Sequence, residues 1–349
     1  MATIKKTGPK RSATIVNVAE KANVSIGTVS RYLNGYQIKE ANRKRIEEAI
    51  AALSYSRNAF ASAMKSEASN MVGLLVPNYD EFHAKLLGEL ATALRREGLV
   101  TLTFCHENHP EGMRDAVDFF RTHRVSALIM TEVEAGHDAI MSMVDDGVQV
   151  ITFDNSPTDD SIDGVVVDNR QASKDAVNYL MDLGHSDISI VTGSLEHWTA
   201  QQRYEGYLDA FKSRGMEPRK DLVFEGNWRR PSGAAALEYF WSLDRRPTAL
   251  FGANHRMSLG ALNYARLNNI SIPDDISLIS FDDIEMYQYL TPSITAIAQP
   301  VLKIADAIRR LLLRRIEADE GEEALVEVLE CDFIKRNSVK ALSGTKGDK

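Results

Sequence analysis

Three segments near the start of the chain carry apolar residues at the spacing of one helix face. The first two are short and meet at a tight polar turn, and the third runs from about Glu40 to Leu53. Thr14 and Ser25 precede the first two helices, and we expect each hydroxyl to cap its helix by accepting from an orphan backbone N–H. The residues expected in the shared apolar seam are Ile15, Val18, Ala19, Ala22, Val24, Thr28, Val29, Leu33, Ile46, Ala49, Ile50 and Leu53.

The second helix has an outer face that this seam does not use. A unit this small buries one narrow strip, which leaves Ile26, Gly27, Ser30 and Arg31 outside it. A helix-turn-helix has this arrangement, and it places its second helix in the major groove of DNA. The alternative is two helices of an ordinary bundle.

From Met71 onward, short apolar runs alternate with helical segments. This alternation predicts α/β architecture, with parallel sheets covered by helices on both faces. We expect four helices to end at a glycine in the left-handed conformation, namely Gly98, Gly147, Gly184 and Gly215. Asn269 is expected to take this place after one further helix. The expected strands are 71–76, 100–105, 127–131, 148–153, 188–192, 222–224, 249–252 and 276–281, and the expected helices are 82–96, 114–123, 171–183, 203–213, 234–243 and 257–268.

The charge is divided unevenly along the 349 residues, a length that predicts two or three folding units. Residues 1–66 hold 12 Lys or Arg and 4 Asp or Glu, which is a net charge of +8. Since the whole chain carries a net charge of −8, the remaining residues carry −16. A basic head on an acidic body indicates a protein that holds a polyanion at one end. A basic tail that only aids solubility is the alternative.

Several classes of protein fit the sequence poorly. It has two cysteines, no apolar run of the ~20 residues that span a bilayer, and no apolar signal-peptide core, so we expect a cytoplasmic protein with no membrane partner. The phosphate-binding Gly-rich motifs and the Gly-x-Ser-x-Gly elbow are missing, so we expect no enzyme and no cofactor. His106 and His109 are spaced like a metal pair but have no third ligand nearby, so we expect no metal site.

The head also carries a long specific pattern. Val24-Ser25-x-x-Thr28-Val29-Ser30-Arg31-x-Leu33-Asn34, followed by Tyr55-x-x-Asn58-x-x-Ala61, closely resembles the head of the lactose/galactose repressor family. In that family the following segment folds on operator DNA, pairs with its symmetry mate and inserts a leucine into the minor groove; Met64 stands at that position here. A plain interdomain linker is the alternative for this segment.

The resemblance continues over nearly the whole chain. Its clearest blocks include Val166-Val167-Asp168-Asn169, Arg203-Tyr204-Glu205-Gly206-Tyr207 and Ser280-Phe281-Asp282-Asp283-Ile284. It implies a periplasmic-binding-protein-like core of two doubly wound subdomains with a ligand cleft between them. Asn78-Tyr79-Asp80-Glu81-Phe82 replaces the family's Asn-Pro-Phe-Phe, which changes one wall of that cleft. The expected division is a disordered arm 1–12, a DNA-binding domain 13–56, a hinge 57–69, a core 70–340 (first subdomain about 70–168 plus 299–324, second about 169–298 plus 325–340) and a flexible tail 341–349.

Polar residues follow several of the expected strands. Asp154, Asn254 and Asp282 come after successive strands, and Arg203 is expected to open a helix. Ligands bind beyond the carboxyl ends of parallel strands, and the resemblance places effector contacts at these positions and an aromatic wall at Trp228. Carboxylates, an arginine fork and an indole face suit a hydroxyl-rich, carbohydrate-like effector. A helix cap or a solvated charge is the alternative for each residue alone. Trp198 and His197 are weaker candidates for the cleft.

The sequence therefore predicts a dimeric transcriptional repressor that binds pseudopalindromic operator DNA and responds to a small effector. Arg31 is expected to reach guanine or a phosphate and Ile26 a thymine methyl, whereas Gly27 reads nothing. A sugar-binding protein with a vestigial head, or a sugar-active enzyme on the same core, are the alternatives. The residues expected at DNA are Thr14, Ser25, Ile26, Gly27, Thr28, Ser30, Arg31, Asn34, Asn58, Ala61 and Met64.

Overall fold

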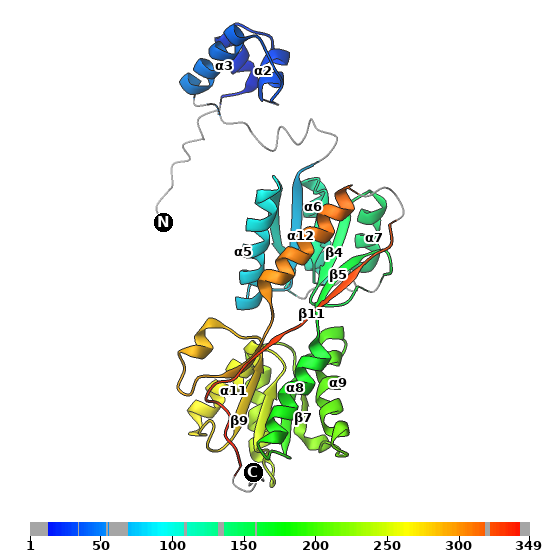
Figure 1. The fold of residues 1–349 in the computed structure, drawn as a ribbon, viewed down its shortest axis with the longest axis vertical. Helices are drawn as coiled ribbons and strands as arrows, with labels where there is room; N and C mark the ends of the chain where they lie inside the picture. Colours follow the sequence, from blue (N-terminus) through cyan, green and yellow to red (C-terminus); the bar gives the residue numbers. More distant parts are fainter. Residues whose placement is uncertain are drawn as a thin grey trace, which may run out of the picture. The chain divides into compact units, whose positions relative to one another are not determined.

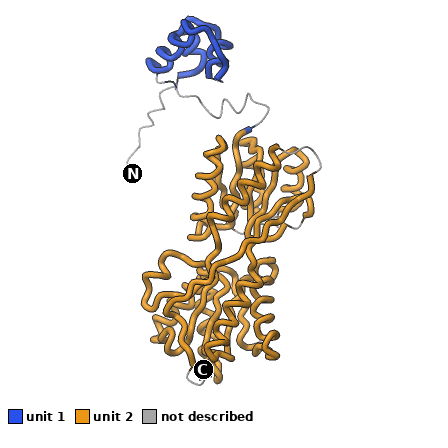
Figure 2. Tube along the Cα trace, viewed as in Figure 1, with its two compact units in different colours: residues 1–69 blue, residues 70–349 orange. Residues whose placement is uncertain are grey.

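The computed structural model describes residues 13–33, 35–53, 55, 69–107, 110–131, 136–157, 159–317 and 322–342. The chain divides into two compact units, residues 1–69 and 70–349 (Figure 2). Each unit is built around its own apolar residues, so each is described separately below.

The described residues of the first unit form three helices, α1 (Ile15–Ala22), α2 (Ile26–Leu33) and α3 (Glu40–Leu53). The predicted caps are present: the Thr14 hydroxyl accepts from the Asn17 N–H at 3.4 Å, and the Ser25 hydroxyl accepts from the Thr28 N–H at 3.2 Å. The buried seam is small, which follows from the narrow apolar stripe of each helix. It consists of Val18, Ala19, Ala22, Val29, Ile46 and Ala49.

The second unit contains two six-stranded sheets (Figure 1). The first has the order β11-β5-β4-β3-β1-β2 and the second β12-β10-β9-β8-β6-β7, so chain neighbours are separated by crossovers. The first sheet comprises β1 (Met71–Val76), β2 (Val100–Cys105), β3 (Ala127–Met130), β4 (Gln149–Phe153), β5 (Asp163–Val167) and β11 (Val326–Leu329). The second comprises β6 (Ile188–Thr192), β7 (Val223–Glu225), β8 (Ala249–Gly252), β9 (Ser277–Phe281), β10 (Thr295–Ala298) and β12 (Asp332–Ile334).

Helices cover both faces of each sheet, as predicted. The helix α12 (Val301–Glu317) lies against α5 (Glu81–Arg96) beside the first sheet, whose other helices are α6 (Pro110–Thr122) and α7 (His137–Asp145). The second sheet carries two packed pairs. One pair is α8 (Asn169–Asp182) with α9 (Trp198–Ser213), and the other is α10 (Arg230–Ser242) with α11 (His255–Leu267). Two short 3-10 turns, η2 (Lys220–Leu222) and η3 (Glu285–Gln288), complete the elements.

The strand pairing corrects two expectations. The sheets are parallel except at β12, which runs antiparallel to β10. The last part of the chain was assigned to the second subdomain from 325 onward, but β11 pairs with β5 in the first sheet. The chain therefore crosses between the sheets three times, after β5, after β10 and after β11.

Several helices begin earlier than expected. The periodic pattern placed helix starts at 114, 203 and 234, but α6 begins at Pro110, α9 at Trp198 and α10 at Arg230. The first turns of α6 and α10 contain proline, glycine and polar residues, which hide the apolar period there. The predicted left-handed residues are confirmed, with φ of 78°, 87°, 90° and 65° at the four glycines and 54° at Asn269.

No helix among the described residues is long and apolar enough to cross a membrane.

Candidate functional site

The first unit presents one helix face, on α2, that is exposed among the residues the structure describes. Ile26 is 44% exposed, and Gly27 and Arg31 are also exposed, while Val29 on the opposite side is fully buried. Ser30 is half-buried, and the Thr28 hydroxyl lies 2.8 Å from that of Ser25 within the cap. The arrangement leaves a short helix free to enter a groove of DNA. Asn34, Asn58, Ala61 and Met64, which were also expected at DNA, lie outside the described residues.

The second unit contains a cavity of about 80 Å³ between the two sheets. This is several times the space that one water molecule needs, and it suits a small polar ligand. Its walls come from loops that follow the carboxyl ends of strands in both sheets, as the general rule for parallel sheets predicts. The lining residues are Pro77, Asn78, Asp80, Phe82, His83, Thr131, Asp154, Asn155, His197, Thr199, Arg203, Trp228, Asn254, His255, Arg256, Asp282 and Gln299.

Three of the lining residues have an unusual backbone. Asp154, Trp228 and Asp282 have φ of 66°, 64° and 68°, in the left-handed region. Aspartate tolerates this region because its short polar chain hydrogen-bonds locally, but a bulky tryptophan rarely adopts it. Strained conformations of this kind concentrate at binding sites, where surrounding contacts hold them.

Arg203 is the buried cation of this cavity, with 2% of its surface exposed. Its guanidinium donates to the Asn169 side chain at 2.8 Å and to the Ala253 carbonyl at 2.6 Å. It stacks on the ring of Phe281 at 3.6 Å, and its Nη2 lies 3.8 Å from Asp154 Oδ1. These contacts fix the guanidinium in one orientation, so it serves as a preset charge and hydrogen-bond donor.

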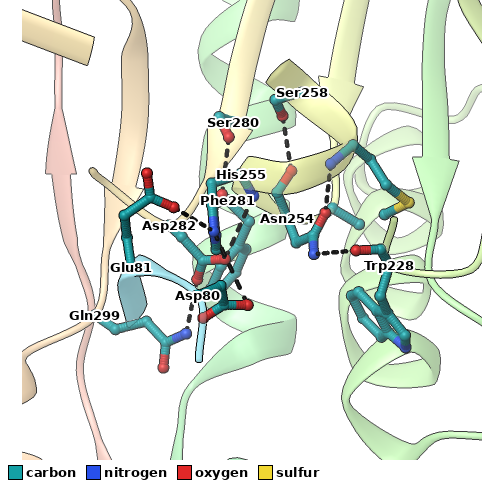
Figure 3. A network of polar contacts seen from close by, with 12 residues as sticks. Asp80, Glu81, Trp228, Asn254, His255, Ser258, Ser280, Phe281, Asp282 and Gln299 are labelled. Atoms are coloured by element: carbon teal, nitrogen blue, oxygen red, sulfur yellow. Dashed lines mark hydrogen bonds and ion pairs between the residues drawn. The ribbon is translucent and has the colours of Figure 1, made fainter. Parts of the chain in front are cut away.

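A polar network around His255 links the two walls (Figure 3). His255 is 1% exposed, and its Nδ1 lies 3.0 Å from Asp282 Oδ2 on the second-sheet side. Its Nε2 lies 3.4 Å from Glu81 Oε2 and 4.0 Å from Asp80 Oδ2, both at the start of α5 on the first-sheet side. Asp282 accepts a further hydrogen bond from the Gln299 amide at 2.8 Å. One imidazole therefore contacts carboxylates of both subdomains.

The network sets the charge state of its members. Burial alone would raise the pKa of Asp282, but its hydrogen bond from His255, the Arg203 charge and the Gln299 amide hold that pKa well below its usual range. Burial alone would lower the pKa of His255, but its hydrogen bond to Asp282 and the charges of Asp282, Asp80 and Glu81 raise it. The pair therefore favours imidazolium against carboxylate.

Asp154 is the opposite case. Desolvation by burial raises its pKa, against the lowering effect of the Arg203 charge. Its Oδ1 is buried and accepts no hydrogen bond from the described residues. A buried carboxylate oxygen without a donor is costly, so a ligand that supplies a hydroxyl or N–H group there gains affinity.

Trp228 and Asn254 hold each other in place at the second-sheet wall (Figure 3). The Asn254 amide donates to the Trp228 carbonyl at 3.3 Å, while its oxygen caps α11 by accepting from the Met257 N–H at 2.8 Å. The Trp228 ring lies against Gly193, where a Cβ atom would come within 2.0 Å of the indole. Asn254 therefore caps a helix, which was the alternative to an effector contact, and it also lines the cavity.

The cavity brings together all five residues expected at the effector and others that the sequence did not single out. Arg203 lies well inside α9 rather than opening it, because α9 begins at Trp198. His197 lines the cavity, whereas Trp198 is absent from the described lining. The residues that sequence reasoning missed include His83, His255 and Gln299. A signal existed for His255, since it directly follows Asn254 at the end of a strand.

Comparison with known families agrees with this geometry. The family model for bacterial regulatory proteins of the lacI family matches residues 14–58, and the model for a periplasmic binding protein-like domain matches residues 177–339. A relative named HTH-type transcriptional repressor PurR, from Vibrio campbellii, is 29% identical over 336 residues, which is 95% of this chain and 100% of the relative. Catabolite control protein A from Priestia megaterium is 28% identical over 91% of this chain and 96% of its own.

Solved structures share the fold over most of the chain. A lac repressor dimer bound to operator and the anti-inducer ONPF matches with a TM-score of 0.83 at 23% identity, covering 95% of this chain and 100% of the other. A complex of the transcriptional regulator CelR with cellobiose matches with a TM-score of 0.70 at 24% identity, covering 93% of this chain and 99% of the other.

Proposed function

The chain belongs to the lacI family of bacterial regulatory proteins, and from that premise we propose that it is a cytoplasmic, dimeric repressor whose hold on operator DNA is controlled by a small carbohydrate-like effector. One observation carries this proposal: the same chain has an exposed face on α2 and a polar cavity between two sheets. In that cavity, a buried oxygen of Asp154 lacks a hydrogen-bond donor among the described residues. We propose a regulatory rather than a catalytic role, because relatives of this chain are named as transcriptional repressors.

At DNA, the roles divide between affinity and reading. The lysines and arginines of residues 1–66 supply sequence-independent attraction to phosphates. Arg31 and Ile26 on the exposed face of α2 read base edges, and Gly27 leaves a gap between them. Residues 57–69 act as the hinge of each subunit, with Met64 as an apolar wedge in the minor groove of a pseudopalindromic site.

In the cavity, Asp154 and Asp282 accept from hydroxyl groups, Arg203 donates, and Trp228 covers an apolar sugar face. Two structural neighbours support a sugar: CelR was solved with cellobiose, and a regulator from Enterococcus faecium was solved with ribose. The effector closes the two subdomains by binding both walls. Gln299 lies in the segment that crosses between the sheets after β10, two residues before α12, and it hydrogen-bonds to Asp282. Movement of Asp282 on closure is therefore passed to this crossing segment.

The test has two arms. Fluorescence anisotropy with DNA from upstream of the chain's own gene measures operator binding at low salt, and thermal unfolding measures binding of sugars to the core. We expect tight binding to one DNA segment, and an effector that changes it. Asp282→Asn is expected to remove the thermal response to the sugar while operator binding persists.

Three results would overturn parts of this proposal. Failure to bind any promoter fragment, with or without sugars, favours a sugar-binding protein with a vestigial head. Turnover of a bound sugar favours an enzyme on the same core. A full response of Asp282→Asn to the sugar would place the effector elsewhere.

A further inference from the structure

A second groove adjoins the outer side of the effector cavity. It shares three lining residues with the cavity, Asn78, Asp80 and Arg256, so the two spaces adjoin. Its walls come from the starts of α5, α10 and α11. The complete lining is Asn78, Tyr79, Asp80, Glu81, Ala84, Arg229, Arg230, Pro231 and Arg256.

Three arginines of this groove lack partners. The guanidinium groups of Arg229, Arg230 and Arg256 make no hydrogen bond and no ion pair with any residue that the structure describes. Arg229 and Arg230 are exposed, and Arg256 is half-buried. Other arginines of the same subdomain are paired, as Arg170 is with Glu205 at 2.6 Å and Arg245 with Asp187 at 2.7 Å. In an acidic unit, three uncompensated arginines at one groove form a local positive charge.

Close packing of two helices creates this cluster. A Cβ atom at Gly233 of α10 would lie 1.9 Å from the Met257 carbonyl oxygen of α11, and one at Gly260 would lie 1.9 Å from the Arg230 carbonyl oxygen. Both positions therefore need glycine for the backbones to approach. The contact holds the first turns of α10 and α11 side by side, which brings Arg229 and Arg230 next to Arg256.

The acidic residues of the groove have other partners. Asp80 lies 2.8 Å from His83 Nδ1, and Glu81 lies 3.4 Å from His255 Nε2. Neither carboxylate lies within ion-pair distance of the three arginines. Both carboxylates therefore contact histidines, and the three arginines are left without a carboxylate partner among the described residues.

We propose that this groove binds a negatively charged substituent, a phosphate or a carboxylate, on an effector whose hydroxyl-bearing part occupies the adjoining cavity. The proposal rests on the proposed function, since it extends the same effector. Arginine suits both anions because its planar fork donates two parallel hydrogen bonds to their oxygens. The separation of roles also explains how a cavity lined by Asp80, Asp154 and Asp282 can serve an anionic ligand: the charge stays outside it.

The first test uses inorganic phosphate as the probe. Thermal unfolding of the full chain is measured in sodium phosphate and in sodium chloride of equal ionic strength. The Arg229→Gln/Arg230→Gln/Arg256→Gln variant is compared with an Arg95→Gln/Arg96→Gln/Arg266→Gln control, which removes as many charges from arginines without carboxylate partners. We expect phosphate to raise the Tm of the wild type and the control by about 2 °C, and that of the groove variant not at all. An equal rise in the groove variant overturns the proposal.

The second test uses matched sugars: neutral aldoses, their monophosphates and their uronic acids, titrated calorimetrically. We expect a charged member to bind the wild type at least about tenfold more tightly than its neutral partner. We expect Arg229→Gln/Arg230→Gln, which leaves the cavity residue Arg256 in place, to lose that advantage while it keeps the affinity for the neutral sugar. Whether the monophosphate or the uronic acid binds more tightly decides between phosphate and carboxylate.

The outcomes separate this proposal from the proposed function. Neutral sugars that bind while their charged partners bind no better overturn the anion groove and leave the effector cavity intact. Failure of every sugar, neutral and charged, overturns the carbohydrate effector, and the inorganic phosphate result then decides the groove on its own.

Discussion

At the scale of single residues, the effector cavity depends on side chains that are held in place before any ligand arrives. Arg203 is fixed by Asn169, Ala253 and the Phe281 ring, and Trp228 is fixed by its left-handed backbone and by Gly193. Such fixed groups bind a ligand without losing further side-chain freedom. The exception is Asp154, whose buried oxygen lacks a donor among the described residues.

Gly193 offers a direct test of that arrangement. A Cβ atom there would lie 2.0 Å from the Trp228 indole, so Gly193→Ala must displace the ring from its wall. We expect about tenfold weaker effector binding with little change in the Tm of the free protein, measured by calorimetric titration and thermal unfolding. Gly88→Ala is the control, because a Cβ atom there meets nothing within 4 Å. Unchanged affinity in Gly193→Ala would show that the indole does not contact the effector.

The residues of the cavity were predictable only where they follow a strand. Asp154, Asn254 and Asp282 follow strands directly, and this pattern can be read from the sequence. The partners of His255 were not predictable in this way. Asp80 and Glu81 lie at the start of α5 in the first subdomain, whereas His255 begins α11 in the second, so their contact depends on how the two sheets are apposed.

At the scale of elements, apolar periodicity predicted most helices and the central strands but missed elements of every length. The third helix of the head was expected at 40–53 and is found there. The strands β5, β10, β11 and β12 and the helices α7 and α12 were missed. β5 begins with Asp163 and Gly164, which are poor strand formers, and Asp163 is accepted in the interior because Arg314 and Arg315 neutralise it. Such compensation comes from distant residues, and local patterns do not contain it.

The contact between the starts of α5 and α11 predicts a dependence on pH. Since the pKa of His255 is raised in the folded core, His255 holds its proton there at pH values at which the unfolded chain has released it. Its stabilising contribution is complete below the unfolded pKa of about 6.5 and is lost as the pH rises through the folded value. Asp80, Glu81 and Asp282 are the carboxylates that face it.

We therefore expect the Tm of the wild-type core to exceed that of His255→Gln by more at pH 6 than at pH 9. Thermal unfolding across that range provides the measurement. His137→Gln, at an exposed position of α7, is the control and is expected to leave the pH profile of the wild type unchanged. A difference between the wild type and His255→Gln that is constant with pH would show that the imidazole contributes by packing alone.

The exposed face of α2 predicts a change in the salt dependence of DNA binding. If Arg31 contacts a phosphate, Arg31→Ala reduces the slope of log affinity against log salt by about 1 and weakens binding to all sequences equally. If it reads a guanine, the slope changes less, and binding weakens by about 1–3 kcal/mol at one base pair only. Anisotropy titrations with an operator and single-base variants separate these results, with Lys21→Ala at the end of α1 as a control. No effect of Arg31→Ala on any sequence would remove α2 as the reading helix.

At the scale of the whole molecule, two units of very different size serve different ligands. The buried seam of the head comprises Val18, Ala19, Ala22, Val29, Ile46 and Ala49, whereas the second unit buries its large side chains over both sheets. Small cores leave little net stability once chain entropy is counted. The head should therefore owe its stability to DNA far more than the core does, and the charge division of +8 against −16 assigns the polyanion to the head.

Two separate thermal transitions should follow from this division. In differential scanning calorimetry of the full chain, we expect a small transition of residues 13–55 at lower temperature and a large one of the second unit at higher temperature. Operator DNA should raise the lower transition, and this rise should disappear at high salt because counterion release drives DNA binding. An effector sugar should raise the upper transition at any salt concentration. Ligand binding to one unit stabilises the other only if the two are coupled. A single transition that moved with either ligand would therefore show that the head and the core unfold together. The allosteric signal would then be transmitted through a shared folded state rather than through a hinge that folds on DNA.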